Sequence, residues 1–301
     1  MRAAAILGLG CSARDLKTFQ AEDGVQWRIG VPAASDQADV ILLLGGDGTV
    51  HRHLGQLVQL GLPVLIVPAG SGNDFANSLG LGRVRDSELA WQKFRGGAAN
   101  VRQVDLGVID ADAERDAAPR RTRYFCCVAG VGFDGEVARR ANRLPRWLRA
   151  HGGYLLSVAA TVFTFAALPM KIFLGGENPG AGAAENWTMR SHRPSLLAAF
   201  ANTPFYGGGM KIAPQAQLDD GQLDVCLVGD VDRFRLFCWF PTVYAGKHLS
   251  IREVEYFKTA RARVETEYPL DVYADGEYVC RTPVEVGVES AALTVITPSG
   301  T

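Results

Sequence analysis

The sequence feature that most constrains the fold is the stretch DVILLLGGDGT at residues 39–49. Its Val, Ile and Leu residues are consecutive, which is typical of a parallel strand buried on both faces of a sheet. The strand runs directly into Gly-Gly-Asp-Gly-Thr, and apolar residues then recur with a helical period over 50–60. Glycines let a bulky group approach the main chain, and a helix N-terminus attracts anions. This stretch therefore predicts a phosphate-binding turn.

The carboxylate of Asp47 has two explanations. A bare carboxylate repels phosphate, so it fits a binding site if a divalent cation lies between the two or if it orients donors around the ligand. Alternatively, the segment is a tight turn in which Asp47 and Thr49 cap the following helix. The loop by itself does not choose between them.

A second loop of the same kind favours the binding site. The apolar strand 63–67 is followed by PAGSGNDFANSLGL at 68–81. Two glycine-rich loops that follow adjacent parallel strands line one crevice, where open α/β sheets bind ligands. Neither loop has the spacing of a Walker loop or of a dinucleotide fingerprint.

Strand and helix alternate over the first hundred residues, which predicts a doubly wound parallel α/β domain. Beyond residue 101, short β-branched segments separated by turn residues predict a mainly antiparallel β domain, a sandwich or barrel. The expected domains are 1–102 and 103–289, with 290–301 packing back onto the first. The expected strands are 3–9, 25–29, 39–44, 63–67, 101–109, 123–129, 170–174, 195–202, 223–227, 260–267, 270–273, 277–280, 284–288 and 293–297. The expected helices are 50–60, 86–95, 135–167 and 231–246, and 175–187 reads as a hairpin loop.

Composition narrows the class of protein. Lys and Arg number 31 against 32 Asp and Glu, so no basic field points to nucleic acid. The six cysteines form no Cys-x-x-Cys pair, which favours reduced thiols in a cytoplasmic protein. The longest apolar stretch, 154–170, is short for a membrane span and is interrupted by Pro169, so a buried helix is expected there.

The two loops belong to a longer series of motifs. GGDGTVH (45–51) and PAGSGNDFA (68–76) are followed by GVGFDGEV (130–137), NTPFYGGGMKIAPQAQLDDGQLDV (202–225), GKH (246–248) and ADGE (274–277). The series spans nearly the whole chain and resembles the diacylglycerol kinase catalytic-domain family. That family contains bacterial lipid kinases and the diacylglycerol, sphingosine and ceramide kinases.

The resemblance implies an NAD kinase/diacylglycerol kinase-like α/β domain followed by a β-sandwich domain. It also implies transfer of the γ-phosphate of ATP to a lipid hydroxyl with Mg²⁺, as in phospholipid metabolism. Glu277 would be the general base, because the attacking hydroxyl must lose its proton. Asp47 would act with a catalytic Mg²⁺, and Gln217, Asp220 and Gln222 would hold a structural Mg²⁺. The implied nucleotide-binding residues are Gly45, Gly46, Asp47, Gly48, Thr49, Val50, His51, Gly70, Ser71, Gly72, Asn73 and Asp74.

Two other residues stay open between roles. Asp134, in GFDG, belongs either to an acidic cluster in the cleft or to the cap of the following helix. Lys211 either reaches phosphate or is a solvated surface lysine.

The protein is expected to bind its lipid substrate as a peripheral protein at the inner face of the membrane. Residues 138–158 place five arginines beside Leu144, Trp147 and Leu148, and basic and aromatic residues on one segment suit an anionic membrane surface. A solvated helix face is the alternative. The resemblance also implies a homodimer.

Three departures from the family pattern affect the nucleotide site. The loop after the first strand is GLGCSARD (8–15), the span before Gly45 holds no full helix, and Arg52 stands where relatives carry Glu. They keep a second hypothesis open, a non-catalytic lipid- or nucleotide-binding protein on a decayed kinase scaffold. NAD kinase, which shares the first loop, is a third.

Overall fold

The computed structural model describes residues 1–21, 24–110, 122–144, 154–176 and 186–299. The chain divides into two compact units, 1–106 with 290–301 and 107–289. Both divisions fall inside strands, β5 (Val101–Asp110) and β15 (Val284–Ile296), so each of these strands contributes residues to both units.

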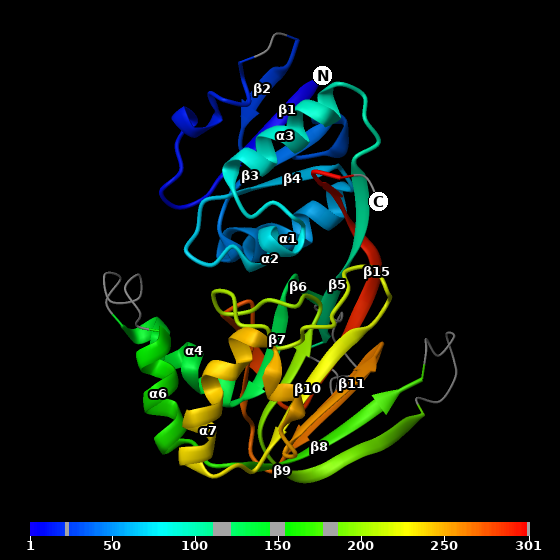
Figure 1. Ribbon diagram of the computed structural model, residues 1–301. Coiled ribbons are helices and arrows are strands. Elements are labelled where there is room, and N and C mark those ends of the chain that lie inside the picture. Colours follow the sequence, from blue (N-terminus) through cyan, green and yellow to red (C-terminus); the bar gives the residue numbers. More distant parts are fainter. Residues whose placement is uncertain (22–23, 111–121, 145–153, 177–185, 300–301) are drawn as a thin grey trace. The chain divides into compact units, whose positions relative to one another are not determined.

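The first unit is built on a parallel sheet (Figure 1). Its strand order is β15-β4-β3-β1-β2, and β3 at its centre is buried at every residue. The register pairs Ile41 of β3 with Val64 of β4 and with Ala4 of β1. Its other elements are β1 (Arg2–Leu7), η1 (Ala13–Leu16), β2 (Gln26–Ile29), η2 (Ser35–Gln37), β3 (Val40–Gly45), α1 (Asp47–Leu60), β4 (Val64–Pro68), α2 (Asp74–Ser78) and α3 (Val84–Arg95).

The second unit is antiparallel and centres on the long strand β9. One half of β9 pairs with β8, and its C-terminal half lies between β7 and β10. The elements are β6 (Thr122–Phe125), β7 (Val128–Gly132), α4 (Phe133–Arg143), α6 (Tyr154–Thr164), β8 (Leu168–Gly175), β9 (Trp187–Ala201), β10 (Leu223–Gly229), α7 (Arg233–Trp239), η4 (Phe240–Ala245), η5 (Lys247–Ser250), β11 (Val254–Thr259), β12 (Arg261–Thr266), β13 (Asp271–Ala274) and β14 (Glu277–Arg281).

The core of the second unit is a cluster of fully buried apolar side chains contributed by β5, β6, β7, β8, β9, β10, β12, β13 and β15. Alternating residues of these strands point into it, as expected for a sandwich. No helix in the described ranges is long and apolar enough to cross a membrane.

Several expected elements are corrected. The strand expected at 123–129 is two strands, because the chain bends at Cys126 and Cys127. The helix expected at 135–167 appears as α4 and α6, with 145–153 outside the described residues. The helix expected at 231–246 is α7 followed by a 3₁₀ helix, and β15 is one strand where two were expected.

The sequence does not predict α2 and β11, because each element is too short for its apolar residues to show a clear helical or strand period. The absence of a full helix before Gly45 is confirmed, since only the 3₁₀ turn η2 lies there. The expected hairpin loop at 175–187 lies mostly outside the described residues.

Candidate active site

The two glycine loops meet at the carboxyl ends of β3 and β4. Their main chains approach so closely that a Cβ added to Gly70 would lie 2.5 Å from the Cα of Gly46, and a Cβ at Gly46 would lie 2.8 Å from the Cα of Gly70. Glycine is therefore required at both positions. The two loops expected to lie together are therefore in direct contact.

Asp47 joins the two loops. It is the first residue of α1, and its carboxylate accepts the N–H groups of Asp74 and Phe75, each at 3.1 Å. Those N–H groups open α2, so Asp47 caps the helix of the second loop rather than its own helix, whose N-cap is Gly46. From the sequence, the alternative role of Asp47 was to cap the helix that follows it, and the structure corrects this because Asp47 caps α2 instead.

Asn73 closes the second loop. Its backbone is left-handed, with φ 57°, and its side chain accepts the N–H of Gly70 and donates to the Gly70 carbonyl, both at 2.8 Å. Asparagine tolerates this conformation better than most residues. The loop is consequently fixed by its own side chain.

The residues predicted to bind nucleotide therefore lie on the two touching loops of the first unit, after β3 and β4. Gly45 ends β3, while Asp47–His51 form the first turn of α1. Asp74 is buried at the start of α2. Helix N-termini and exposed loop amides favour phosphate, and carboxylate oxygens such as those of Asp47 fit a hard cation such as Mg²⁺.

Glu277 is the first residue of β14 and is exposed. The turn that precedes it is anchored by Asp275, whose carboxylate accepts three successive N–H groups, those of Cys126 at 2.9 Å, Cys127 at 2.8 Å and Val128 at 3.2 Å. Because Asp275 adopts φ 49°, its side chain folds back onto the bend between β6 and β7. The sequence indicated only an Asp-Gly turn here and missed the anchor.

The negative charge of the acidic turn at Asp220 is balanced by the ammonium group of Lys258. Asp220 accepts the N–H of Gln222 at 3.1 Å and pairs with Lys258 Nζ at 2.5 Å. Lys258 lies 3.7 Å from Asp224 Oδ2, and Tyr256 donates to the other oxygen of that carboxylate at 2.7 Å. Burial raises the pKa of Asp224 above its ordinary value.

The residues around Asp220 fit a Mg²⁺ ion in their chemistry. Carboxylate oxygens gather here, and buried Asp224 Oδ2, 3.7 Å from Lys258 Nζ, accepts no hydrogen bond from the residues that the structure describes. The ammonium of Lys258 already supplies positive charge to the same carboxylates, so it would compete with a cation. Sequence reasoning missed Lys258 because it lies on β11, an element that was not predicted.

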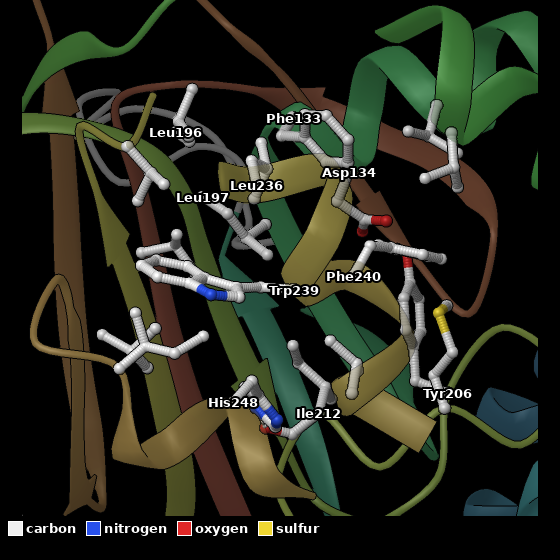
Figure 2. Close-up of a pocket in the computed structure, with 18 residues that line it drawn as sticks. Phe133, Asp134, Leu196, Leu197, Tyr206, Ile212, Leu236, Trp239, Phe240 and His248 are labelled. Atoms are coloured by element: carbon white, nitrogen blue, oxygen red, sulfur yellow. Dashed lines mark hydrogen bonds between the residues drawn. The ribbon is translucent and has the colours of Figure 1, made fainter. Parts of the chain in front are cut away.

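An apolar cavity lies in the second unit (Figure 2). Its wall carries a single carboxyl, that of Asp134, among the described residues. The lining residues are Phe133, Asp134, Val137, Val158, Leu196, Leu197, Tyr206, Met210, Ile212, Val228, Val231, Leu236, Trp239, Phe240, Val243, His248, Ile251 and Val254.

Desolvation shifts the pKa values of Asp134 and His248, which both line the cavity, in the direction that favours the neutral form. Burial raises the pKa of Asp134 to about 7, and it lowers the pKa of His248. His248 Nε2 lies 3.0 Å from the Ile212 carbonyl, and its buried Nδ1 has no hydrogen-bond partner within the described part of the chain. Asp134 does not cap α4, because the N-cap of that helix is Gly132 and it has no side-chain cap, and Asp134 lines the apolar cavity instead.

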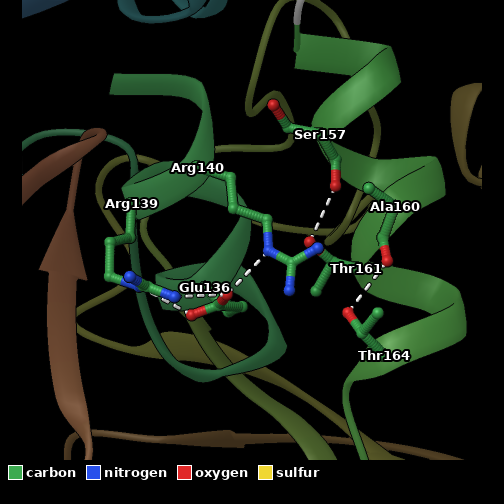
Figure 3. Close-up of polar contacts among 7 residues, drawn as sticks. All are labelled: Glu136, Arg139, Arg140, Ser157, Ala160, Thr161 and Thr164. Atoms are coloured by element: carbon green, nitrogen blue, oxygen red, sulfur yellow. Dashed lines mark hydrogen bonds and ion pairs between the residues drawn. The ribbon is translucent and has the colours of Figure 1, made fainter. Parts of the chain in front are cut away.

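The basic segment expected at the membrane is described only in part. Arg139 and Arg140 both bind Glu136, each with a contact of 2.6 Å (Figure 3), so their charge is partly compensated. Residues 145–153, with Trp147 and Leu148, lie outside the described residues. Lys211 lies over the ring of Phe205, 5.9 Å from its centroid.

Two family models match the chain. The diacylglycerol kinase catalytic domain matches residues 14–109, and the YegS C-terminal NAD kinase beta sandwich-like domain matches residues 127–297. The second match spans more than half of the chain.

A curated relative and two solved structures resemble the chain. It is 34% identical to "Diacylglycerol kinase" of Mycobacterium tuberculosis (strain CDC 1551 / Oshkosh) over 268 residues, 88% of this chain and 79% of the relative. A diacylglycerol kinase structure from Bacillus anthracis str. Sterne has a TM-score of 0.63 at 18% identity, covering 98% of this chain and 96% of that one. The structure of an NAD kinase from Archaeoglobus fulgidus in complex with ATP has a TM-score of 0.53 at 14% identity, covering 99% of this chain and 94% of that one. At such identities the structures show the fold alone, and the expected fold class is confirmed.

Proposed function

Because the chain belongs to the family of lipid kinases that carry a diacylglycerol kinase catalytic domain, we propose that it transfers the γ-phosphate of ATP to the hydroxyl of a diacylglycerol-like or sphingoid lipid. The observation that carries the lipid assignment is the apolar cavity of the second unit. Such a lining suits an acyl chain. An NAD kinase needs polar groups for a dinucleotide, so this lining argues against that hypothesis.

We assign the nucleotide to the two glycine loops of the first unit. The first turn of α1 offers its N-terminus to phosphate, and the glycines at 46 and 70 leave the main chain bare. Asp47 would hold a catalytic Mg²⁺, which neutralises phosphate charge when bound. Asp47 also keeps the loops together, so its removal would affect nucleotide binding as well as turnover.

We assign the proton transfer to Glu277. A carboxylate within hydrogen-bond reach takes the proton of the lipid hydroxyl as the hydroxyl oxygen bonds to phosphorus and the bond to the leaving oxygen breaks. Glu277 suits this role because it is exposed at the start of β14 and its turn is anchored by Asp275. The second cation, at Gln217, Asp220 and Gln222, would have a structural role, shared with Lys258.

We expect the protein to work as a peripheral protein on the inner face of the membrane, where such lipids reside. A homodimer, which the family resemblance implies, remains a prediction.

The test is a kinase assay with γ-labelled ATP, Mg²⁺ and mixed micelles of candidate lipids. We expect label in one lipid class for the native protein and a loss of roughly a hundredfold or more in Glu277→Gln. Glu267→Gln, an exposed glutamate of the same unit, is the matched control and should keep full activity.

Two results would count against the proposal. ATP binding without label in any lipid would favour the binding-only hypothesis and direct attention to Arg52, which is exposed on α1. Label transferred to NAD rather than to lipid would favour NAD kinase.

A further inference from the structure

Helices α6 and α7 carry aromatic side chains on their outer faces. Phe234 is 73% exposed, Phe237 50%, Tyr244 44% and Phe163 42%. The ring of Phe163 lies 6.1 Å from that of Phe234 and 5.8 Å from that of Phe237, measured between centroids. These four residues, called here the aromatic surface, join α6, α7 and η4.

The aromatic surface lies on the same helices as the cavity wall. Leu236, Trp239 and Phe240 face the cavity, while Phe234 and Phe237 of the same helix face outward. Figure 1 shows α6 and α7 beside each other at one end of the unit, and they are in contact. A surface helix of a soluble protein normally has a single apolar face, which points toward the core. An apolar outer face over an apolar cavity therefore needs a second apolar partner.

Cations predominate around the aromatic surface, and the exposed carboxylates nearby in the sequence are Asp230 and Asp232, which stand immediately before α7. The described part of α6, Tyr154–Thr164, has no charged residue, and residues 233–252 contain four cations and no carboxylate. Arg235 pairs with Glu253 and stacks on Trp239. Arg233, Lys247 and Arg252 are exposed and, among the residues that the structure describes, make no ion pair.

We propose that the aromatic surface docks on an anionic phospholipid bilayer, with Phe163, Phe234, Phe237 and Tyr244 in the headgroup and acyl boundary. The cations match lipid phosphates, and the rings match the apolar layer beneath them. The proposal rests on the proposed function, because a kinase for lipid needs access to a bilayer. It differs from the expected contact through 138–158, where Arg139 and Arg140 are paired with Glu136.

A second copy of the chain fits this surface less well. In a symmetric dimer the same patch meets itself, so a surface on which Arg233, Lys247 and Arg252 outnumber Asp230 and Asp232 would face an identical, mainly cationic surface. Like charges at an interface are unfavourable. A bilayer of anionic lipid has the opposite charge.

The test is co-sedimentation of the full chain with vesicles of phosphatidylcholine, with and without about a third of phosphatidylglycerol. We expect binding to the anionic vesicles and at least about a tenfold weaker partition for Phe234→Ser combined with Phe237→Ser. The matched control combines Tyr268→Ser and Met189→Ser, which are 68% and 53% exposed in the same unit; it should bind as the native chain does. Thermal unfolding of each variant checks that it folds.

The outcomes separate docking from catalysis. Equal vesicle binding by both double variants would overturn the docking proposal, even if the chain phosphorylates lipid in micelles. A native chain that ignores vesicles but forms a dimer, lost with Phe234→Ser and Phe237→Ser, would overturn it in favour of self-association. The native chain could bind vesicles but show no kinase activity. If the Phe234→Ser, Phe237→Ser variant then loses vesicle binding, the docking proposal is supported and only the proposed kinase function fails.

Discussion

At the scale of single residues, the most informative contact is that of Asp275. One carboxylate organises three backbone N–H groups from a distant part of the sequence, and Asp275 stands two residues before Glu277. Hydrogen bonds from N–H groups to a carboxylate are among the stronger protein hydrogen bonds. We therefore regard Asp275 as a positioning residue for Glu277.

Asp275→Asn is expected to lower kcat by roughly ten- to a hundredfold while the KM for ATP stays near the native value, because a small displacement of a catalytic group is costly. Asparagine still tolerates the left-handed backbone but presents an NH₂ group to an N–H donor. Steady-state kinetics and thermal unfolding check this together. A native kcat, or a large rise in the KM for ATP, would contradict the positioning role.

The raised pKa of Asp134 predicts a stability that depends on pH. Its pKa is raised from 3.8 to about 7 by burial, so the folded chain binds a proton that the unfolded chain releases over this range. The free energy of unfolding should therefore fall as the pH rises from about 4 to about 7.

The variant Asp134→Asn should lose most of that slope and be more stable than the native chain at about pH 8. Urea unfolding at about pH 5 and about pH 8 measures the slope. Asp230→Asn, at an exposed position of the same unit, should keep it. A slope that survives in Asp134→Asn would assign the pH dependence to other groups.

At the scale of elements, the two glycine loops act as one unit because their main chains touch. Gly70→Ala adds a Cβ that would lie 2.5 Å from the Cα of Gly46, a contact that only a shift of the loops relieves. We expect at least about tenfold weaker binding of an ATP analogue by calorimetry and a loss of roughly 1–3 kcal/mol in stability.

Gly55→Ala is the matched control on α1. A Cβ there meets nothing within 4 Å, and alanine favours helix over glycine, so stability should stay equal or rise and nucleotide binding should not change. Equal behaviour of the two variants would show that the close approach of the loops does not matter for the nucleotide.

The same scale shows where sequence reasoning succeeds for elements. Strand β3 was predicted because five apolar residues in a row leave little alternative. The strand break at Cys126 and Cys127 was not predicted, because both residues are apolar and the cause of the bend is Asp275, about 150 residues later in the chain. Helix α2 escaped because it has only five residues and depends on Asp47 of the other loop for its cap.

At the scale of the molecule, the first unit needs both ends of the chain. The end of β15 adds a strand to the parallel sheet through the pairing of Val295 with Val64. Asn100 donates its side-chain N–H groups to the carbonyls of Thr297 at 2.8 Å and of Ala90 at 2.9 Å. The C-terminal segment is therefore part of the first unit.

Removing residues 290–301 should destabilise the first unit by roughly 3–5 kcal/mol, because β4 loses a neighbour and Asn100 loses a buried partner. Hydrogen exchange of the β3 and β4 amides should speed up, while amides of β9 keep their protection. A chain shortened only by residues 300–301 is the control. Unchanged exchange in β4 after the longer deletion would contradict this account.

The sequence by itself determined the alternation of strand and helix, the two glycine loops and the antiparallel second half, because hydrophobic period and glycine content act locally. Only the tertiary structure decided that Asp47 caps α2, that Lys258 compensates Asp220, that Asp275 anchors the turn before Glu277, and that Asp134 faces an apolar cavity. The physical reason is the same in each case. The partner of the charge is far away in the sequence, and burial, which sets the cost of leaving a carboxylate unpaired, exists only once the chain is folded.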